Sequence, residues 1–513
     1  MQRTAKRVKS IWLVLTCLCM LLAACTLQAA QHITQPTPSP TPVLYSLAQG
    51  GSCVTLGAHP QPPYANIRVT RDTYLAHSEP MLAENPRNPL NLVGGTKFFT
   101  DPKHYRFQIG YLSSFDGGCT WLDGGVFPGF SASETTSDIS LAFGLHNDVY
   151  ALVLNASGVT NSNESGVSVL ASHDGGRTFG QPVSVFDDTS GETFSDKPWI
   201  AVDQTNGPRN GTIYVVWSYD HGGFCGYGNF CSQELAFSRS TDGGKSFSPV
   251  RFVEGHAPFC TNPARGHPAG STLCDGVLGA TPAVLPDGSL AVAFMYMDVM
   301  STGRIPSRLA VVTSPDGGTT WNAPSLVATI HDIPGIFRPE RYRNASLPAF
   351  ACDPRTGQIY ITWSDESSRD ADILFSTSTD RGRTWSPLPI RVNDDLDEDG
   401  ANQFQPQIAV APDGVVSIMF FDTRVDPRHL FVDVFLAQST DRGASFLSNL
   451  RVTTQSWDPA VDAPVDENGL QFIGDYQGLA ADNIFVHPFW NDSRTGSQEI
   501  FTAAIPSAQP GQA

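Results

Sequence analysis

The stretch SPDGGTTW, residues 314–321, is one of six copies of a single pattern in this 513-residue chain. Each copy reads Ser-x-Asp-x-Gly-x-Thr/Ser-aromatic, and the aspartates lie 58 to 74 residues apart. Asp and Ser/Thr side chains hydrogen-bond the backbone of tight turns, and glycine permits a positive φ. The closing aromatic ring suits packing against a neighbouring unit. One structural unit therefore repeats along the chain, with the other copies at 114–121, 172–179, 240–247, 378–385 and 439–446.

These six stretches resemble the Asp-box, or BNR, repeat of sialidases and related β-propellers. The resemblance extends from about Ala65 to Ile505. It implies an all-β fold of four-stranded blades in which each repeat links the third strand to the fourth. It also implies that the repeats lie on the face opposite to a catalytic centre.

Seven blades are expected, because two alternating apolar runs precede each repeat and a seventh pair follows the last one. The seventh unit has neither the repeat nor a fourth strand. Residues 66–70 (NIRVT) match the fourth-strand segment 449–453 (NLRVT), so we predict that they complete the last blade beside residues 499–504. Such closure removes the open strand edges of the ring. The count departs from the six-bladed catalytic domain of sialidases.

The N-terminus indicates export. Basic residues precede an apolar run at 11–22, and the sequence Leu-Ala-Ala-Cys ends at Cys25. This ending resembles a bacterial lipobox, which implies cleavage before Cys25 and attachment of lipid to its thiol. An ordinary secretory peptide is the alternative. We expect a signal peptide at 1–24, a Pro/Thr/Ser-rich tether at 25–62, the propeller at 63–506 and a disordered tail at 507–513. The protein would sit on the outer face of the bacterial cell membrane.

Charge limits the partners. Without residues 1–24 the chain keeps 28 basic and 50 acidic residues, a net charge of −22. So acidic a surface argues against nucleic acid, and against membrane contact other than through the lipid anchor.

The cysteines suit an oxidising compartment. Cys225 with Cys231 and Cys260 with Cys274 flank short loops and are expected to form local disulfides. Pairing of Cys53 with Cys119 is possible and would leave Cys352 as a buried free thiol. Zinc is the weaker alternative, because the sequence has no Cys-x-x-Cys and no histidine cluster.

Polar residues gather in the loops that enter first strands or follow second strands. In a propeller these loops share one face, where carboxylates and arginines can form a sugar site. Sialidases use three arginines to hold a carboxylate, a Tyr/Glu pair as nucleophile and an Asp as acid/base; arginine suits the carboxylate because it binds in a bidentate manner. The resemblance implies Tyr476 as nucleophile with Glu79 as its base, and Asp138 or Asp196 as acid/base. Arg343, Arg424 and Arg494 would bind substrate. The alternative is that the repeated Asp and Arg residues only tie down loops.

A second motif suggests a metal. Asp395, Asp397 and Asp399, followed by Gly400, place oxygen ligands at alternate positions, and Gln403 is a possible later ligand. This spacing of the first three ligands is typical of a Ca²⁺-binding loop, although the loop has no glutamate at its twelfth position. A solvated acidic loop is the alternative.

The sequence supports two functions. The first is a surface lipoprotein of the sialidase-like superfamily that engages a glycan or glycoconjugate; an exo-α-sialidase or related glycoside hydrolase is the catalytic form of this function that the resemblance implies. The second is a non-catalytic propeller that binds a surface protein or polysaccharide. A propeller fold alone does not decide between them.

Overall fold

The computed structural model describes residues 43–45, 63–132, 134–157, 165–188, 193–221, 233–261, 270–297, 306–337, 342–344, 347–396, 399–466 and 468–509. The predicted signal peptide, Cys25 and all but three residues of the predicted tether lie outside these ranges. Across these ranges, no helix is both long and apolar enough to span a membrane.

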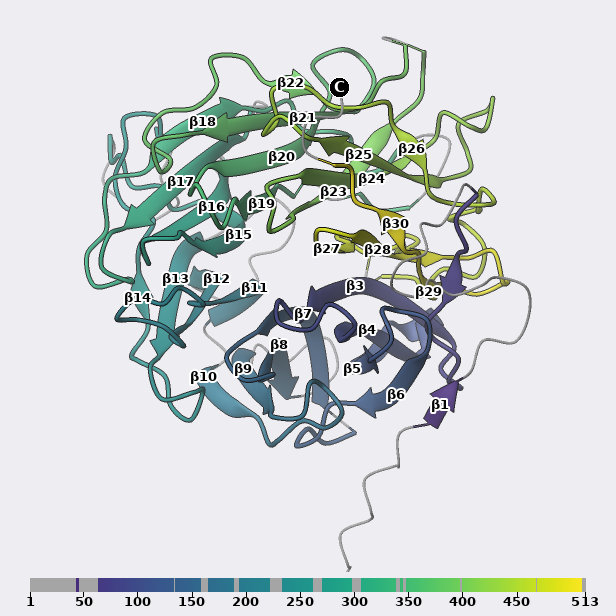
Figure 1. The fold of residues 1–513 in the computed structure, drawn as a ribbon, viewed down its shortest axis with the longest axis horizontal. Helices are drawn as coiled ribbons and strands as arrows, with labels where there is room; N and C mark the ends of the chain where they lie inside the picture. Colours follow the sequence, from purple (N-terminus) through teal and green to yellow (C-terminus); the bar gives the residue numbers. More distant parts are fainter. Residues whose placement is uncertain are drawn as a thin grey trace, which may run out of the picture. The chain divides into compact units, whose positions relative to one another are not determined.

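The fold is a β-propeller of seven four-stranded antiparallel blades, as predicted (Figure 1). In the following, each blade is given from its innermost strand outward. The first blade is β3 (Ala76–Glu84), β4 (Leu92–Asp101), β5 (Arg106–Ser114) and β6 (Trp121–Val126); the second is β7 (Glu134–Phe143), β8 (Val149–Ser157), β9 (Ser165–Ser172) and β10 (Val183–Asp188); the third is β11 (Thr193–Val202), β12 (Ile213–His221), β13 (Gln233–Ser240) and β14 (Arg251–Phe252); the fourth is β15 (Val277–Val284), β16 (Leu290–Tyr296), β17 (Arg308–Ser314) and β18 (Ser325–Thr329). The fifth blade is β19 (Ala349–Cys352), β20 (Ile359–Asp365), β21 (Asp372–Ser378) and β22 (Ile390–Arg391); the sixth is β23 (Gln403–Val410), β24 (Val416–Asp422), β25 (Asp433–Ser439) and β26 (Leu450–Arg451); the last is β27 (Gly478–Ala481), β28 (Phe485–Asp492), β29 (Glu499–Thr502) and β2 (Ile67–Arg68).

The ring closes through the N-terminal strand, as the sequence predicted. β2 pairs antiparallel with β29 as the outer strand of the last blade, with Ile67 opposite Thr502. The innermost strands of successive blades contact one another around the whole ring, and β27 of the last blade contacts β3 of the first. Because the last blade takes its fourth strand from the start of the chain, both ends of the propeller are held in one sheet.

The hydrophobic core consists of clusters that join adjacent blades. One cluster, for example, packs Tyr360 and Phe375 of the fifth blade against Ile408 and Phe420 of the sixth. Side chains alternate between the two faces of the sheet along each strand, and apolar side chains lie on both faces of each blade. Each blade therefore buries one face against each neighbour. A blade in this arrangement depends on its neighbours for its core.

All six repeats form the predicted turn between the third and fourth strands. In residues 314–321, Ser314 Oγ donates to Asp316 Oδ1 at 2.9 Å and accepts from Gly318 N at 2.7 Å. The backbone N–H and hydroxyl of Thr320 donate to the two oxygens of Asp316. The closing Trp321 packs on Phe237 of the preceding blade, with ring centroids 5.1 Å apart. The same four hydrogen bonds recur in the other five copies.

Three further elements extend beyond the four-stranded blades. β1 (Val43–Tyr45), within the predicted tether, pairs with β6 as a fifth strand of the first blade. The short 3₁₀ helix η1 (Pro102–His104) connects β4 to β5. β30 (Ile505–Pro506) pairs with β28, and the buried Ala508 packs near Ala411, so ordered structure continues past residue 506.

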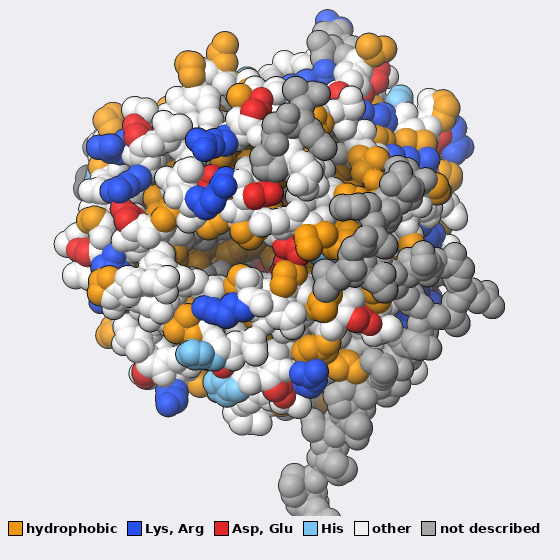
Figure 2. All heavy atoms as spheres, in the orientation of Figure 1, with side chains coloured by type: hydrophobic (Ala, Val, Ile, Leu, Met, Phe, Trp, Pro, Cys, Tyr) orange, Lys and Arg blue, Asp and Glu red, His pale blue; other side chains and the backbone are white. Residues whose placement is uncertain are grey.

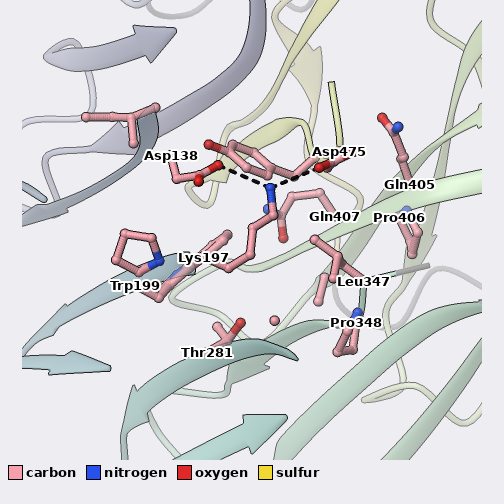
Figure 3. Close-up of a pocket in the computed structure, with 15 residues that line it drawn as sticks. Asp138, Lys197, Trp199, Thr281, Leu347, Pro348, Gln405, Pro406, Gln407 and Asp475 are labelled. Carbon is pink, nitrogen blue, oxygen red and sulfur yellow. Dashed lines mark hydrogen bonds and ion pairs between the residues drawn. The ribbon is translucent and has the colours of Figure 1, made fainter. Parts of the chain in front are cut away.

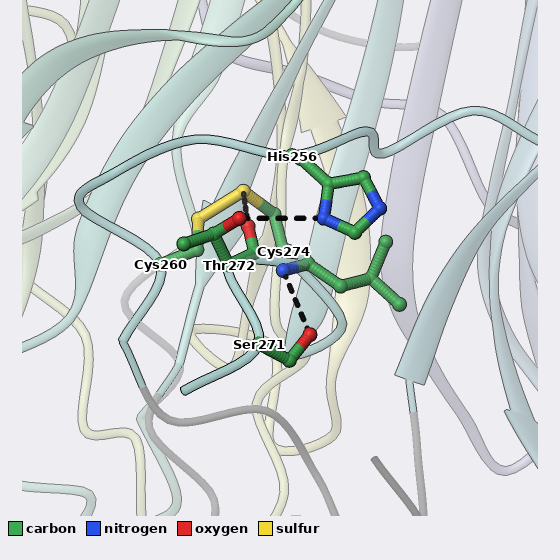
Figure 4. Close-up of a disulfide and its surroundings, with 6 residues drawn as sticks. His256, Cys260, Ser271, Thr272 and Cys274 are labelled. Carbon is green, nitrogen blue, oxygen red and sulfur yellow. Dashed lines mark hydrogen bonds between the residues drawn. A yellow bond between two sulfur atoms is a disulfide. The ribbon is translucent and has the colours of Figure 1, made fainter. Parts of the chain in front are cut away.

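The predicted bond between Cys260 and Cys274 is confirmed (Figure 4). His256 lies beside this disulfide, where its Nδ1 is 3.4 Å from Thr272 Oγ1. Cys119 is also disulfide-bonded, but its predicted partner Cys53 lies outside the described ranges, as do Cys225 and Cys231. Cys352 is a free thiol and is partly buried.

Candidate functional site

A β-bulge recurs in the innermost strand of five blades and turns one residue of each toward the centre of the ring. At each bulge the register against the second strand shifts, and the first bulged residue has a positive φ. Bulges of this kind re-aim a side chain. Only one of the five is the glycine that a positive φ favours, so the other four hold backbone strain of about 1–3 kcal/mol each. The five are Glu79 (φ 53°), Asp138 (47°), Lys197 (47°), Gly279 (64°) and Gln405 (50°).

Three of these residues meet in a buried charge cluster. Lys197 Nζ lies 3.1 Å from Asp138 Oδ1 and 2.9 Å from Asp475 Oδ2 (Figure 3). It also lies 3.5 Å from Glu79 Oε1. Lys97 Nζ pairs with the other oxygen of Glu79 at 2.6 Å. The cluster therefore joins the first, second, third and last blades through one ammonium group.

The cluster fixes the charge of its carboxylates. Burial alone would raise the pKa of Asp138, but Lys197 and Lys97 outweigh it and hold that pKa below its usual range. Burial would likewise raise the pKa of Asp475, and Arg343 with Lys197 lower it instead. Both carboxylates are therefore anions at neutral pH.

Asp196 differs from these carboxylates. Burial raises its pKa to about 7, because Lys197 only partly offsets the loss of hydration and the nearby charges of Asp138 and Asp475 add to the rise. Its Oδ1 accepts the backbone N–H of Lys197 at 3.0 Å. Of the two alternatives predicted for the acid/base residue, Asp196 is thus the one whose pKa lies in the range that suits proton transfer near neutral pH.

A pocket lies beside the cluster, and we refer to it as the axial pocket. Its interior is narrow: about 20 Å³ can be reached by the centre of a water molecule, and the volume is about 480 Å³ only when all space between the lining atoms, open solvent included, is counted. The molecule is also hollowed at the centre of the face seen down the ring (Figure 2). Apolar and polar side chains from six blades line the pocket: Asp138, Ile139, Lys197, Pro198, Trp199, Gly279, Thr281, Leu347, Pro348, Ala349, Gln405, Pro406, Gln407, Asp475 and Tyr476.

Tyr476 lines this pocket, as a nucleophile would have to. Its ring packs edge-on against Trp199, with centroids 6.2 Å apart, and Lys197 Nζ lies 5.5 Å from the ring centroid. Its hydroxyl has no hydrogen-bond partner among the described residues. Burial, together with the charges of Glu79 and Asp138, raises the pKa of the Tyr476 hydroxyl well above its ordinary value.

Glu79, the predicted base, lies in the adjoining blade as expected. Its carboxylate, however, is bound by Lys97 and Lys197, and it accepts the backbone N–H of Asp475 at 3.2 Å. The described contacts do not link it to the hydroxyl of Tyr476. Glu79 therefore anchors the two lysines in this structure.

Of the three predicted arginines, only Arg343 reaches the cluster. Its Nε donates to Asp475 Oδ1 at 3.2 Å, its Nη2 contacts Asp475 Oδ2, and its Nη1 lies 3.6 Å from Asp466. The guanidinium also lies over the ring of Phe472. Arg343 therefore holds Asp475 in place.

Arg424 and Arg494 each bind a carboxylate of their own blade, and Arg424 also binds Asp394 in the segment after β22 of the fifth blade. Arg424 Nε donates to Asp422 at 2.7 Å and its Nη1 to Asp394 at 2.6 Å. In the next blade Arg494 Nε donates to Asp492 at 2.8 Å. No described contact joins either arginine to Arg343.

The same two guanidinium groups belong to a repeated link between outer strands. Each donates to an asparagine at the start of the outer strand of its own blade, Asn449 at 3.2 Å and Asn66 at 2.9 Å. These asparagines donate to carbonyls of the preceding blade, Val392 O and Val452 O. The contacts tie down loops, which is the alternative that the sequence left open.

The acidic loop after β22 holds Asp395 among hydrogen-bond donors. Asp395 Oδ1 accepts from Arg391 at 3.0 Å and Asn393 at 2.7 Å, and its Oδ2 accepts from Gln403 at 2.9 Å. Asp399 accepts a backbone N–H two residues later, and Asp397 lies outside the described ranges. No group of three or more metal-ligating side chains occurs among the described residues. Because a carboxylate held by N–H groups has few lone pairs left, the described part of this loop does not fit Ca²⁺.

The sequence placed Lys197 and Asp475 among the polar residues that enter first strands but gave them no role, and it did not select Lys97. Lys97 lies mid-strand in β4 and has no motif around it. A repeated residue-Pro pair marks several bulges, at Glu79-Pro80, Lys197-Pro198 and Gln405-Pro406. That repeat could have indicated Lys197 as the equivalent of Glu79.

The sequence matches no protein-family model and no curated protein. Several solved structures are similar in fold. A protein of unknown function from Dyadobacter fermentans is 14% identical, with a TM-score of 0.49 over 74% of this chain and 97% of that one. The Hadza microbial sialidase Hz136 is 15% identical, with a TM-score of 0.46 over 82% and 75%. The NanB sialidase of Streptococcus pneumoniae is 13% identical, with a TM-score of 0.41 over 86% and 70%. None is similar enough to indicate a function for this chain.

Proposed function

We propose that the protein binds a glycan in the axial pocket. The observation that carries the proposal is the lining of the pocket, to which the partly buried Trp199, Tyr476 and Asp138 all contribute, with the Trp199 ring edge-on against the Tyr476 ring. Binding sites for small molecules are concave and largely apolar, with a few fixed polar groups that orient the ligand. An aromatic ring can contact the C–H face of a sugar while polar groups bind its hydroxyls.

Calorimetric titration of a panel of oligosaccharides would test the proposal. Trp199→Ala should weaken binding at least tenfold, because the indole forms part of the pocket wall. Phe252→Ala is the matched control, since Phe252 is an aromatic residue on an outer strand and is 44% exposed. If neither the wild type nor the control binds any glycan of the panel, the proposal is wrong.

Hydrolysis of the bound glycan is a second candidate, favoured by Asp138, which lines the pocket, and by Asp196, which does not line it but directly precedes the pocket residue Lys197. Asp138 is held ionised, whereas burial raises the pKa of Asp196 to about 7. Carboxylates whose pKa values are driven apart can divide the roles of anion and general acid. Tyr476 would act as the nucleophile at the same pocket. The three arginines do not gather there, so the sialidase form of this chemistry is the less supported one.

Turnover of aryl glycosides, neutral and sialylated, would test hydrolysis. Asp196→Asn should remove the limb of the pH–rate profile near pH 7 and lower kcat by 10²-fold or more. Tyr476→Phe should abolish turnover and leave binding measurable. Binding without turnover of any aryl glycoside would leave the binding module as the function.

We also propose that the protein works at the outer face of the cell membrane, held by lipid on Cys25. The support is the export sequence and its Leu-Ala-Ala-Cys ending. Cys25→Ala should move the protein from the membrane fraction to the soluble fraction. An unchanged distribution would contradict the lipid anchor.

A further inference from the structure

We propose that the axial pocket selects a neutral sugar and rejects a carboxylated one. This inference rests on the proposed glycan binding and specifies its ligand class. Recognition of an anionic sugar requires a cation that can leave its present partners or has none. The described cations around the pocket are already bound to carboxylates of the protein.

The two lysines are fully engaged. Lys197 Nζ contacts Asp138, Asp475 and Glu79, which accounts for its three protons. Lys97 pairs with Glu79 at 2.6 Å, and its ammonium group also lies 4.4 Å from the ring centroid of Phe107. Both side chains are buried, so neither can turn outward to a ligand without leaving a buried carboxylate unpaired.

The arginines are engaged as well. Arg343 binds Asp475 through two nitrogens and lies near Asp466. Arg424 and Arg494 lie in the links between outer strands and do not line the pocket. Asp138, Asp475 and Glu79 thus face Lys97, Lys197 and Arg343 in the cluster. The pKa values of Asp138 and Asp475 are lowered, so both are anions, whereas burial raises the pKa of Glu79.

The polar atoms left for a ligand are acceptors and hydroxyl groups. Lys197 contacts Oδ1 of Asp138, and no described hydrogen bond involves Oδ2. The hydroxyl of Tyr476 is buried and has no partner among the described residues, and Thr281 also lines the pocket. Sugar hydroxyls can donate to such atoms. A ligand carboxylate would instead meet Asp138 and Asp475, and like charges brought together at a binding site reduce affinity strongly.

Matched pairs of glycans test this selection with the wild-type protein. The pairs are neutral oligosaccharides and their sialylated forms, such as lactose and sialyllactose. In calorimetric titration, at least one neutral member should bind, and its sialylated partner should bind at least tenfold more weakly. The preference should shrink as salt rises, because screening weakens the repulsion.

Two variants test the cause. Asp475→Asn removes the anion that engages Arg343 and Lys197, so it should narrow the preference for the neutral ligand at least threefold. Asp187→Asn, at an exposed position on β10, removes the same charge away from the pocket and should change nothing. Thermal melting checks that both variants are folded. If Asp475→Asn does not fold, Asp138→Asn is the second variant, with the same expected change.

The outcomes separate the two proposals. If wild-type protein binds a sialylated glycan and no neutral one, the neutral-sugar inference is wrong and glycan binding stands. If no glycan in the panel binds, the proposed function fails and this inference fails with it. An unaltered preference in the folded Asp475→Asn variant would contradict the electrostatic cause.

Discussion

The protonation state of His77 is expected to make the stability of the closing blade depend on pH. His77 is buried, with Nε2 3.1 Å from Asp72 and Nδ1 3.3 Å from Glu499 of the last blade. Burial opposes its charge, but the hydrogen bonds and charges of these two carboxylates raise the pKa of His77 to about 9. Arg68 shares Glu499, at 2.6 Å, and Tyr74 and Phe98 pack against the imidazole ring.

A histidine with a higher pKa in the folded than in the unfolded state stabilises the fold when protonated. Its contribution is complete below pH 6.5 and is lost as pH rises through about 9. The loss should be on the order of 3 kcal/mol. Denaturant unfolding at pH 6.5 and 9.5 should show it in the wild type and not in His77→Gln. Equal losses in both proteins would assign the pH dependence to other groups.

Experiments on the acidic loop can distinguish two roles of Asp395, a ligand of Ca²⁺ or a structural acceptor of hydrogen bonds. Its oxygens accept from Arg391, Asn393 and Gln403, so Asp395→Ala should remove one acceptor from each of these donors and cost about 1–3 kcal/mol of unfolding free energy, while Arg391 and Asn393 keep Asp372 as an acceptor. A chelator should not change the melting temperature of the wild type. A chelator-induced drop that Asp397→Ala abolishes would instead establish a calcium loop.

At the scale of elements, β2 is the strand whose loss should matter most. It pairs with β29, and Val69 N donates to Ile500 O at 2.7 Å just beyond it. Deleting residues 1–71 would expose the edge of β29 and remove the links of Asn66 to the neighbouring blade. We expect a melting temperature at least 10 °C lower, together with aggregation.

Deletion of residues 1–42 is the control for this truncation. It removes the export sequence and the start of the tether but keeps β1 and β2. Its melting curve should match that of the mature protein. Identical melting of the two truncated proteins would mean that β2 does not close the ring.

For the whole molecule, the buried cluster around Lys197 joins four blades at the centre of the ring. Lys197→Met should leave Asp138 and Asp475 short of a counter-charge and cost about 3–5 kcal/mol. Lys103→Met, at an exposed site in η1, is the matched control and should have little effect. Chemical denaturation of both variants measures the difference. If Lys197→Met is as stable as its control, the cluster does not hold the blades together.

The sequence by itself determined the architecture of this protein. The six repeats predicted the turns between third and fourth strands, and the match of residues 66–70 to other fourth strands predicted how the ring closes. The disulfide between Cys260 and Cys274 followed from their short separation of 14 residues. These features depend on local chemistry or on patterns that recur along the chain, and both can be read without knowing which blades touch.

The centre of the ring was decided by tertiary structure. Lys197 meets Asp138, 59 positions away, and Asp475, 278 positions away, because bulges at Asp138 and Lys197 and the segment that enters β27 bring the three side chains together. A bulge adds one residue to its strand and re-aims a side chain, but which charged groups of other blades that side chain meets depends on how the blades assemble. The sequence could therefore place Arg424 and Arg494 in loops after second strands, but only the assembled blades showed that they turn to the outer strands rather than to the pocket.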